Sequence, residues 1–175
     1  MPIEMNISEA SINGLNTIAM LISEANKDVA LRFGLNALNC PKHPSFCTAE
    51  WVKADFARGE KYFLIAENAT PIGCVAYESP RAGIAYMNRL SVLPKHRKRG
   101  VGSQLVEHFI RYAEAQSVRT ISIGVIEQHL ELRSWYRARG FEEGESKEFP
   151  HLPFVVKYMS YSLAPAVAVS TDLRA

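Results

Sequence analysis

The first third of the chain has a helical pattern of apolar residues, followed by a less regular segment. Ser8 is a suitable N-cap for a helix whose apolar positions recur at helical spacing: Ile12, Leu15, Ile18, Ala19 and Ile22. Alternation over residues 29–35 then favours a strand. Thr48 has the side chain of an N-cap and Gly59 is a natural helix end, so the pattern predicts a second helix between them.

From Tyr62 onward the pattern changes to strands separated by two helices. A break at residues 68–71 between two alternating runs predicts a hairpin. The predicted elements that follow the second helix are strands at 62–66, 72–77 and 84–92, a helix at 101–113, a strand at 121–125, a short helix ending at Gly140, and a closing antiparallel pair at 141–149 and 154–163.

This order of elements predicts a three-layer domain. The strand-helix-strand portion implies a right-handed parallel crossover inside a mixed, mostly antiparallel sheet. Helices on both faces of that sheet give a layered α/β (α+β) fold. A chain of 175 residues suits one domain, which we predict over residues 1–163. Residues 164–175 have no core pattern and are expected to form a tail.

Composition and charge narrow the class of protein. With 47% hydrophobic and 22% charged residues, the chain has the composition of a globular domain. A formal net charge of +2 gives no global basic field for nucleic acid, and no apolar run is long enough to cross a membrane. Three cysteines argue against a disulfide framework, and the polar start differs from a signal peptide, so a cytoplasmic location is expected. Cys40, His43 and Cys47 lack a fourth ligand, and no metal site is expected.

The most informative segment joins the strand at 84–92 to the helix at 101–113. Gly100 and Gly102 stand where that helix begins, and the basic residues Arg97, Lys98 and Arg99 come directly before them. A helix start leaves backbone N–H groups unpaired and favours negative charge. Glycines let the backbone approach a diphosphate closely. We therefore predict a phosphate cradle at residues 97–103.

Other phosphate motifs match this segment less well. A Walker loop requires a lysine after its second glycine, but Ser103 follows Gly102 here. A dinucleotide-binding fingerprint requires a third glycine, where this chain has Leu105, and it normally follows the first strand. Residues 95–99 also have the composition of a solvated basic loop or a nucleic-acid patch, although their place against the two glycines favours a phosphate ligand.

Two motifs resemble the GNAT superfamily of N-acetyltransferases. Val92-x-Pro94-x-x-Arg97-x-x-Gly100-x-Gly102-Ser103-x-Leu105 is similar to motif A of that family, and Trp135-Tyr136-Arg137-Ala138-Arg139-Gly140-Phe141 is similar to its motif B. The resemblance covers residues 60–163. It implies the GNAT-type sheet with flanking helices and acetyl-CoA as the acyl donor.

The resemblance also implies roles for particular residues. Backbone amides from Lys98 or Arg99 through Gly100, Val101, Gly102 and Ser103 would hold the pyrophosphate of coenzyme A. The strand end from Leu90 to Val92 would pair with the pantetheine arm and present an N–H to the thioester carbonyl. Tyr136 would protonate the departing thiolate while a neutral amine attacks directly.

The sequence departs from the family at two positions that matter for catalysis. His129 stands where many members carry an asparagine that touches the coenzyme arm. Residues 86–90 lack the glutamate base that several members have there, and Glu127 is the nearest substitute. His129 or an ordered water are the alternatives, so the base stays open.

The predicted function is transfer of acetyl from acetyl-CoA to a primary amine of a small molecule or a protein. The alternative is a non-catalytic acyl-CoA-binding or sensing module, because the cradle alone is sufficient to bind. The sequence leaves open whether the chain pairs as a homodimer.

Overall fold

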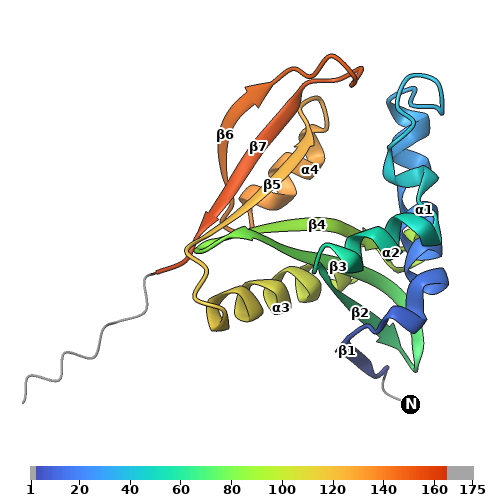
Figure 1. Ribbon diagram of the computed structural model, residues 1–175, viewed down its shortest axis with the longest axis vertical. Helices are drawn as coiled ribbons and strands as arrows, with labels where there is room; N and C mark the ends of the chain where they lie inside the picture. Colours follow the sequence, from blue (N-terminus) through green and yellow to red (C-terminus); the bar gives the residue numbers. More distant parts are fainter. Residues whose placement is uncertain (1–2, 165–175) are drawn as a thin grey trace, which may run out of the picture.

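The computed structural model describes residues 3–164, which form seven strands and four α-helices (Figure 1). Short 3-10 turns lie at Ile12–Gly14, Pro44–Phe46 and Pro94–His96. The helices and strands in chain order are β1 Met5–Glu9, α1 Leu15–Arg32, α2 Ala49–Ala57, β2 Lys61–Glu67, β3 Thr70–Arg81, β4 Ile84–Val92, α3 Val101–Ala115, β5 Thr120–Ile126, α4 Leu130–Arg137, β6 Glu142–Lys147 and β7 Val156–Ser162.

The strands form one mixed sheet in the order β1-β2-β3-β4-β5-β7-β6. Every neighbouring pair is antiparallel except β4 and β5, which are parallel and are joined through α3. The predicted crossover, the hairpin after Tyr62 and the closing antiparallel pair are therefore confirmed.

The sheet opens between its two central strands. The β4–β5 ladder covers only Ile84 to Tyr86 against Thr120 to Ser122, whereas β5 stays paired with β7 as far as Ile126. Figure 1 shows the two halves of the sheet meeting at this short ladder and spreading apart beyond it. Beyond Tyr86, the side of β4 that faces β5 is therefore an unpaired strand edge, although β4 lies in the middle of the sheet.

A β-bulge in β4 marks the point of separation. Cys74 pairs with Ser91 and Ala76 with Asn88, so β4 has one more residue than β3 between these pairs. Arg89 occupies this bulge with φ 58°. Because the extra residue shifts the alternation, Leu90 and Val92 pack against the core on the α3 face, while Ser91 turns to the α1 face, where Asn26 contacts it.

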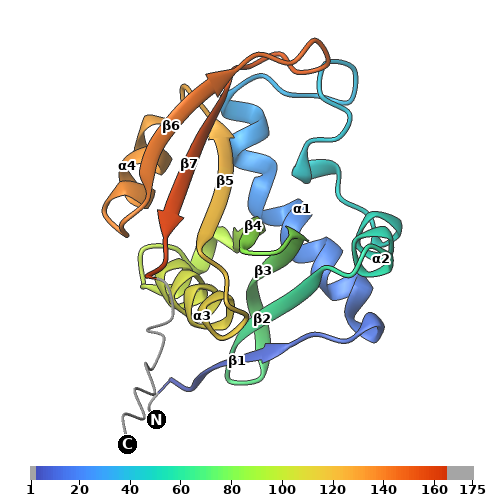
Figure 2. The ribbon, with the colours of Figure 1, turned by 60° about the vertical axis from the view of Figure 1, so that its left-hand side comes forward.

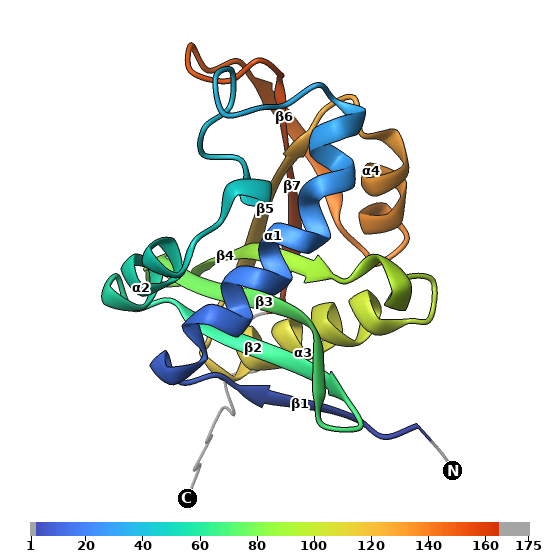
Figure 3. The ribbon, with the colours of Figure 1, turned by 90° about the vertical axis from the view of Figure 1, so that its right-hand side faces the viewer.

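Two helical layers cover the sheet, as Figures 2 and 3 show. The larger core packs α3 and α4 against one face and includes Leu105, Phe109, Ile121 and Tyr136. The second core packs α1 and α2 against the other face around Ile22 and other buried residues. The predicted three-layer α/β fold is confirmed. Among residues 3–164, no helix is long and apolar enough to cross a membrane.

The N-terminal part differs from the prediction in two ways. Ser8 lies in β1, which the apolar pattern did not predict, and Ser11 caps the 3-10 turn before α1 instead. The strand predicted at residues 29–35 is wrong because α1 continues to Arg32. The alternation that suggested it depends on Leu31, which is 85% exposed on the helix surface. The predicted tail beyond Ala164 lies outside the described residues.

The second helix matches its predicted signals. The Thr48 hydroxyl accepts a hydrogen bond from the Trp51 N–H, and Gly59 ends the segment with φ 89°, a conformation that suits glycine.

Candidate active site

The loop between β4 and α3 is shaped by two residues in left-handed conformation. Lys98 has φ 60° and Gly100 has φ 81°, and α3 begins immediately afterwards at Val101. The first bond of the helical ladder runs from the Gln104 N–H to the Gly100 carbonyl at 3.0 Å. The amides of Val101, Gly102 and Ser103 precede that bond and lie at the positive end of the helix dipole. The predicted cradle therefore has the backbone geometry of an anion site.

The two glycines of this loop serve different purposes. A Cβ at Gly100 would meet no atom within 4 Å, so its requirement is the positive φ. A Cβ at Gly102 would lie 3.1 Å from Cζ2 of Trp135, so its requirement is the close contact of α3 with α4. Gly102, in the first of the two sequence motifs, thus allows close contact with Trp135, in the second.

Arg139 reinforces this contact between α3 and α4. Its guanidinium carbon lies 3.6 Å from the centre of the Trp135 ring, and its Nε donates to the Ser103 hydroxyl at 3.0 Å. A positive charge consequently stands next to the cradle from the α4 side. No sequence pattern predicts this role for Arg139, because it reaches Ser103 only through the fold.

The side chains of Arg97 and Arg99 are already occupied by protein groups. Arg97 donates to the Ala25 carbonyl at 2.5 Å and to the Val92 carbonyl at 3.2 Å, and it pairs with Asp28 on α1. Arg99 pairs with Glu67 at 2.9 Å. Of the three basic residues expected around a phosphate, only Lys98 is left with an exposed side chain and no ion pair among the described residues. An anion bound here would therefore depend mainly on backbone amides.

We expect the anchoring of Arg97 on α1 to stabilise the fold mainly through the two carbonyl contacts. The exposed Arg97–Asp28 ion pair contributes less than ~1 kcal/mol. Each hydrogen bond to a carbonyl contributes about 1 kcal/mol. Urea denaturation of Arg97→Gln should show a free energy of unfolding lower by ~1–3 kcal/mol. In Asp28→Asn, the free energy of unfolding should fall by less than ~1 kcal/mol. An equal fall in the free energy of unfolding of the two variants would contradict the larger contribution of the carbonyl contacts.

The free edge of β4 leads directly to this loop. Beyond Tyr86, no backbone pairing with β5 is present in the described part of the chain. Leu90 and Val92 lie on this edge just before the loop. An edge with unpaired N–H and C=O groups accepts an extended, amide-containing ligand as an added strand. The pantetheine arm has that chemistry, so the residues present fit coenzyme A.

Tyr136 lies on α4 in the same core cluster as Leu90 and Val92. Its ring packs edge-on against Trp135 and Phe141, with centroids 5.0 and 5.3 Å away. Burial raises the pKa of Tyr136 well above its usual value, which keeps the phenol protonated at neutral pH. Within residues 3–164, its hydroxyl donates no hydrogen bond to another side chain.

His129 and Glu127 occupy different surroundings. His129 precedes α4, and its ring packs edge-on against Phe33 at 5.4 Å, at the far end of α1. Burial lowers its pKa, assisted by the charge of Arg32, so the ring is neutral at pH 7. Glu127 follows β5, and its carboxylate accepts a hydrogen bond from Ser146 on β6. Glu127 therefore points away from β4, and its role as base stays a prediction.

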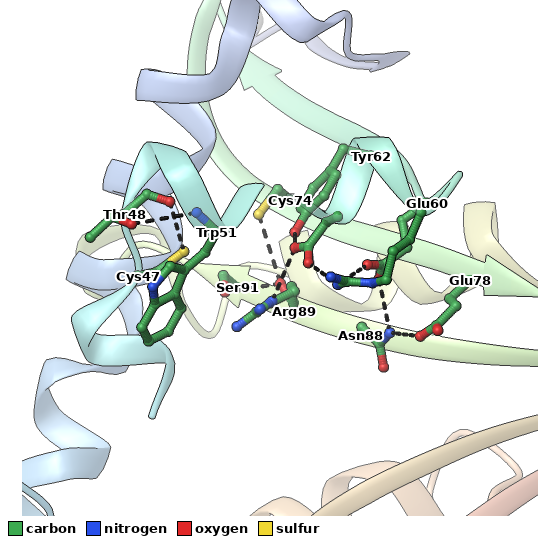
Figure 4. Close-up of polar contacts among 12 residues, drawn as sticks. Cys47, Thr48, Trp51, Glu60, Tyr62, Cys74, Glu78, Asn88, Arg89 and Ser91 are labelled. Carbon is green, nitrogen blue, oxygen red and sulfur yellow. Dashed lines mark hydrogen bonds and ion pairs between the residues drawn. The ribbon is translucent and has the colours of Figure 1, made fainter. Parts of the chain in front are cut away.

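A polar cavity of about 300 Å³, which the sequence did not predict, lies on the α1–α2 face. It lies beside β4, and Figure 4 shows several of its polar side chains gathered over the strands. No local motif predicts it, since its residues come from the 3-10 turn at Pro44–Phe46, from α2 and the link between α2 and β2, and from β3 and β4. Its lining consists of Pro44, Asp55, Arg58, Glu60, Glu78, Asn88 and Arg89. Among the described residues, no three His, Cys, Asp or Glu side chains are grouped to hold a metal ion.

Comparison with known proteins identifies the class. The sequence model of the Acetyltransferase (GNAT) family matches residues 32–141, and the chain belongs to this family. It is therefore an acyltransferase of the GNAT type, a class that uses acetyl-CoA as the donor. A comparison with curated protein sequences gives no match.

Solved structures share the fold at low sequence identity. A ribosomal-protein-alanine N-acetyltransferase from Escherichia coli matches with TM-score 0.76 and 15% identity, over 95% of this chain and 98% of that one. The PaiA N-acetyltransferase from Thermoplasma acidophilum, in complex with coenzyme A, matches with TM-score 0.77 and 16% identity, over 91% and 99%. A putative acetyltransferase from Salmonella typhimurium with acetyl-CoA has TM-score 0.68 and 16% identity, over 94% and 96%.

Proposed function

We propose that this chain transfers an acetyl group from acetyl-CoA to a primary amine by direct attack of the amine on the thioester. The observation that carries the proposal is the free edge of β4, which runs from the bulge at Arg89 to the glycine loop at the start of α3. This edge and this loop together offer a strand partner for the pantetheine arm and an anion site for the diphosphate.

In this proposal each group has one task. Amides from Lys98 or Arg99 to Ser103 hold the diphosphate. An N–H of the edge from Leu90 to Val92 stabilises the carbonyl oxygen as it gains negative charge. Tyr136 donates its proton to the departing thiolate, for which its protonated state at neutral pH is suitable. His129, beside α1 and α4, lines the approach of the coenzyme arm. The three buried, unpaired cysteines favour a reducing, cytoplasmic location.

Thiol release from acetyl-CoA, measured with and without added primary amines, tests this activity. We expect release that depends on the amine and saturates with its concentration, together with a product heavier by one acetyl group. Coenzyme binding without amine-dependent release would instead favour the non-catalytic binding module. Homodimer formation and the expected absence of a nucleic-acid partner stay predictions.

A further inference from the structure

The cavity beside β4 has an uneven balance of charge. Its wall has three carboxylates, on Asp55, Glu60 and Glu78, against two guanidinium groups, on Arg58 and Arg89. With all five ionised, one negative charge is left without a protein cation. A ligand that completes the cavity is therefore expected to be positively charged.

The contacts show where that excess charge resides. Asp55 is 2% exposed and well compensated, because it pairs with Arg58 and Arg89 and accepts a hydrogen bond from the Tyr62 hydroxyl at 2.5 Å. Glu78, in contrast, pairs with no cation among the described residues. The uncompensated charge is thus on the Glu78 side of the cavity, away from Asp55.

A single amide joins Glu78 to the second carboxylate. The side-chain nitrogen of Asn88 donates to Glu78 Oε2 at 2.8 Å and to Glu60 Oε1 at 3.1 Å, as Figure 4 shows. Glu60 is only 4% exposed, and its other oxygen binds Arg58 at 2.8 Å. Two carboxylates held on one amide form a fixed pair of acceptors at the cavity wall.

This pair lies next to the proposed reaction centre. Asn88 directly precedes the bulge at Arg89 and stands two residues before Leu90 on β4. The two intervening peptide bonds keep its Cα within about 7 Å of that of Leu90, whose edge is proposed to meet the thioester. An amine held between Glu60 and Glu78 would therefore lie beside the same stretch of β4 whose edge is proposed to meet the thioester.

We propose that this cavity binds the ammonium group of the acceptor between Glu60 and Glu78, and that Glu60 removes its proton. The inference rests on the acetyl transfer proposed above and supplies the base that the sequence did not assign. The ammonium gives one proton to the Glu60 carboxylate and becomes a neutral amine. The nitrogen lone pair then forms the C–N bond, and the C–S bond breaks with its electron pair on sulfur. Tyr136 gives its proton to the thiolate and recovers one from the nitrogen, while Glu60 returns its proton to water.

The surroundings of Glu60 favour its role as a base. Burial raises its pKa, and the negative charges of Asp55 and Glu78 add to that effect, while the Asn88 hydrogen bond opposes it. A carboxylate with a raised pKa takes a proton from an ammonium group more readily than an ordinary one. The charged groups that face Glu60 are Asp55 from α2, Arg58 directly after α2, Glu78 from β3 and Arg89 from β4.

Glu60→Gln tests the base with little change of shape. The acceptors to use are butylamine, 1,4-diaminobutane and a short peptide with a free alanine N-terminus, which distinguish small amines from a protein terminus. For the best acceptor, kcat/KM is expected to fall at least ~100-fold, and the acid limb of its pH profile, with a pKa above the usual glutamate value, should disappear. The dissociation constant of acetyl-CoA should stay within about twofold, because the coenzyme cradle is untouched.

Glu78→Gln tests the binding half of the proposal and does not depend on the Glu60 variant folding. Glu78 is partly buried and bonded to Asn88 alone, so its replacement is expected to raise KM for the amine about tenfold with a smaller effect on kcat. Glu114→Gln, an exposed glutamate on α3, is the matched control and should behave like the unmodified chain.

The outcomes separate this inference from the proposed function. Unchanged kcat/KM and pH profile in Glu60→Gln, or unchanged KM in Glu78→Gln, would overturn the cavity as the amine site and leave acetyl transfer standing. Tight binding of acetyl-CoA with no turnover of any of the three amines would also overturn it. If the unmodified chain fails to bind acetyl-CoA, the proposed function itself is wrong.

Discussion

Gly100→Asp should abolish coenzyme binding. The residue has φ 81°, which strains any side chain placed there, but a Cβ at this position would meet no atom within 4 Å. The aspartate carboxylate would stand beside the amides that are proposed to hold the diphosphate, and it would repel that group while competing for the same N–H donors. We expect the dissociation constant of acetyl-CoA to rise at least ~100-fold, which titration calorimetry measures directly.

Gly100→Asn is the matched control for this prediction. Asparagine tolerates left-handed conformation about as well as aspartate and has nearly the same shape, but it has no charge. Most of the affinity should therefore remain in Gly100→Asn. If a folded Gly100→Asp variant binds acetyl-CoA as the unmodified chain does, residues 97–103 are not the cradle.

Tyr136→Phe should reduce turnover strongly and leave coenzyme affinity nearly unchanged. The side chain is buried and its hydroxyl makes no side-chain hydrogen bond within residues 3–164, so loss of the hydroxyl alone leaves the ring packing of α4 intact. Loss of a general acid typically costs ~10²–10⁴ in rate. The expected result is a fall of kcat in that range, with an acetyl-CoA dissociation constant within about twofold of the original.

Tyr161→Phe controls for loss of a hydroxyl from the same aromatic group. Tyr161 lies on β7 and packs against Phe141, which in turn contacts Tyr136, with ring centroids 5.4 and 5.3 Å apart. Its replacement should leave kcat unchanged. A fully active Tyr136→Phe variant would remove the tyrosine from the mechanism and return it to a packing role.

Most of the fold was accessible from the sequence because its signals are local. Thr48 and Gly59 delimit α2 through cap chemistry, and the alternation after Tyr62 reports strands with one buried face. The prediction of a strand at residues 29–35 was wrong for a physical reason. An exposed leucine such as Leu31 imitates a buried strand position, and only the packing of α1 against the sheet decides between the two.

The candidate site likewise has some features that the sequence predicts and others that depend on tertiary structure. The loop at Gly100 is readable because left-handed backbone and a helix start leave a local signature. The cavity at Glu60 is not readable, because Asn88 and Glu78 approach it only through the β3–β4 register and the bulge at Arg89. Arg97 shows a third case: its position was found, but its contact with Asp28 on α1 depends on tertiary structure.

The most direct test of coenzyme A binding is calorimetric titration of the purified chain with acetyl-CoA, coenzyme A and ATP under the same conditions. The β4 edge and the glycine loop predict that both coenzyme A species bind more tightly than ATP, because only they have a pantetheine arm for the edge as well as a diphosphate for the loop. Equal binding of all three would reduce the loop to a general anion site. Absence of binding to acetyl-CoA would contradict the assignment of this site.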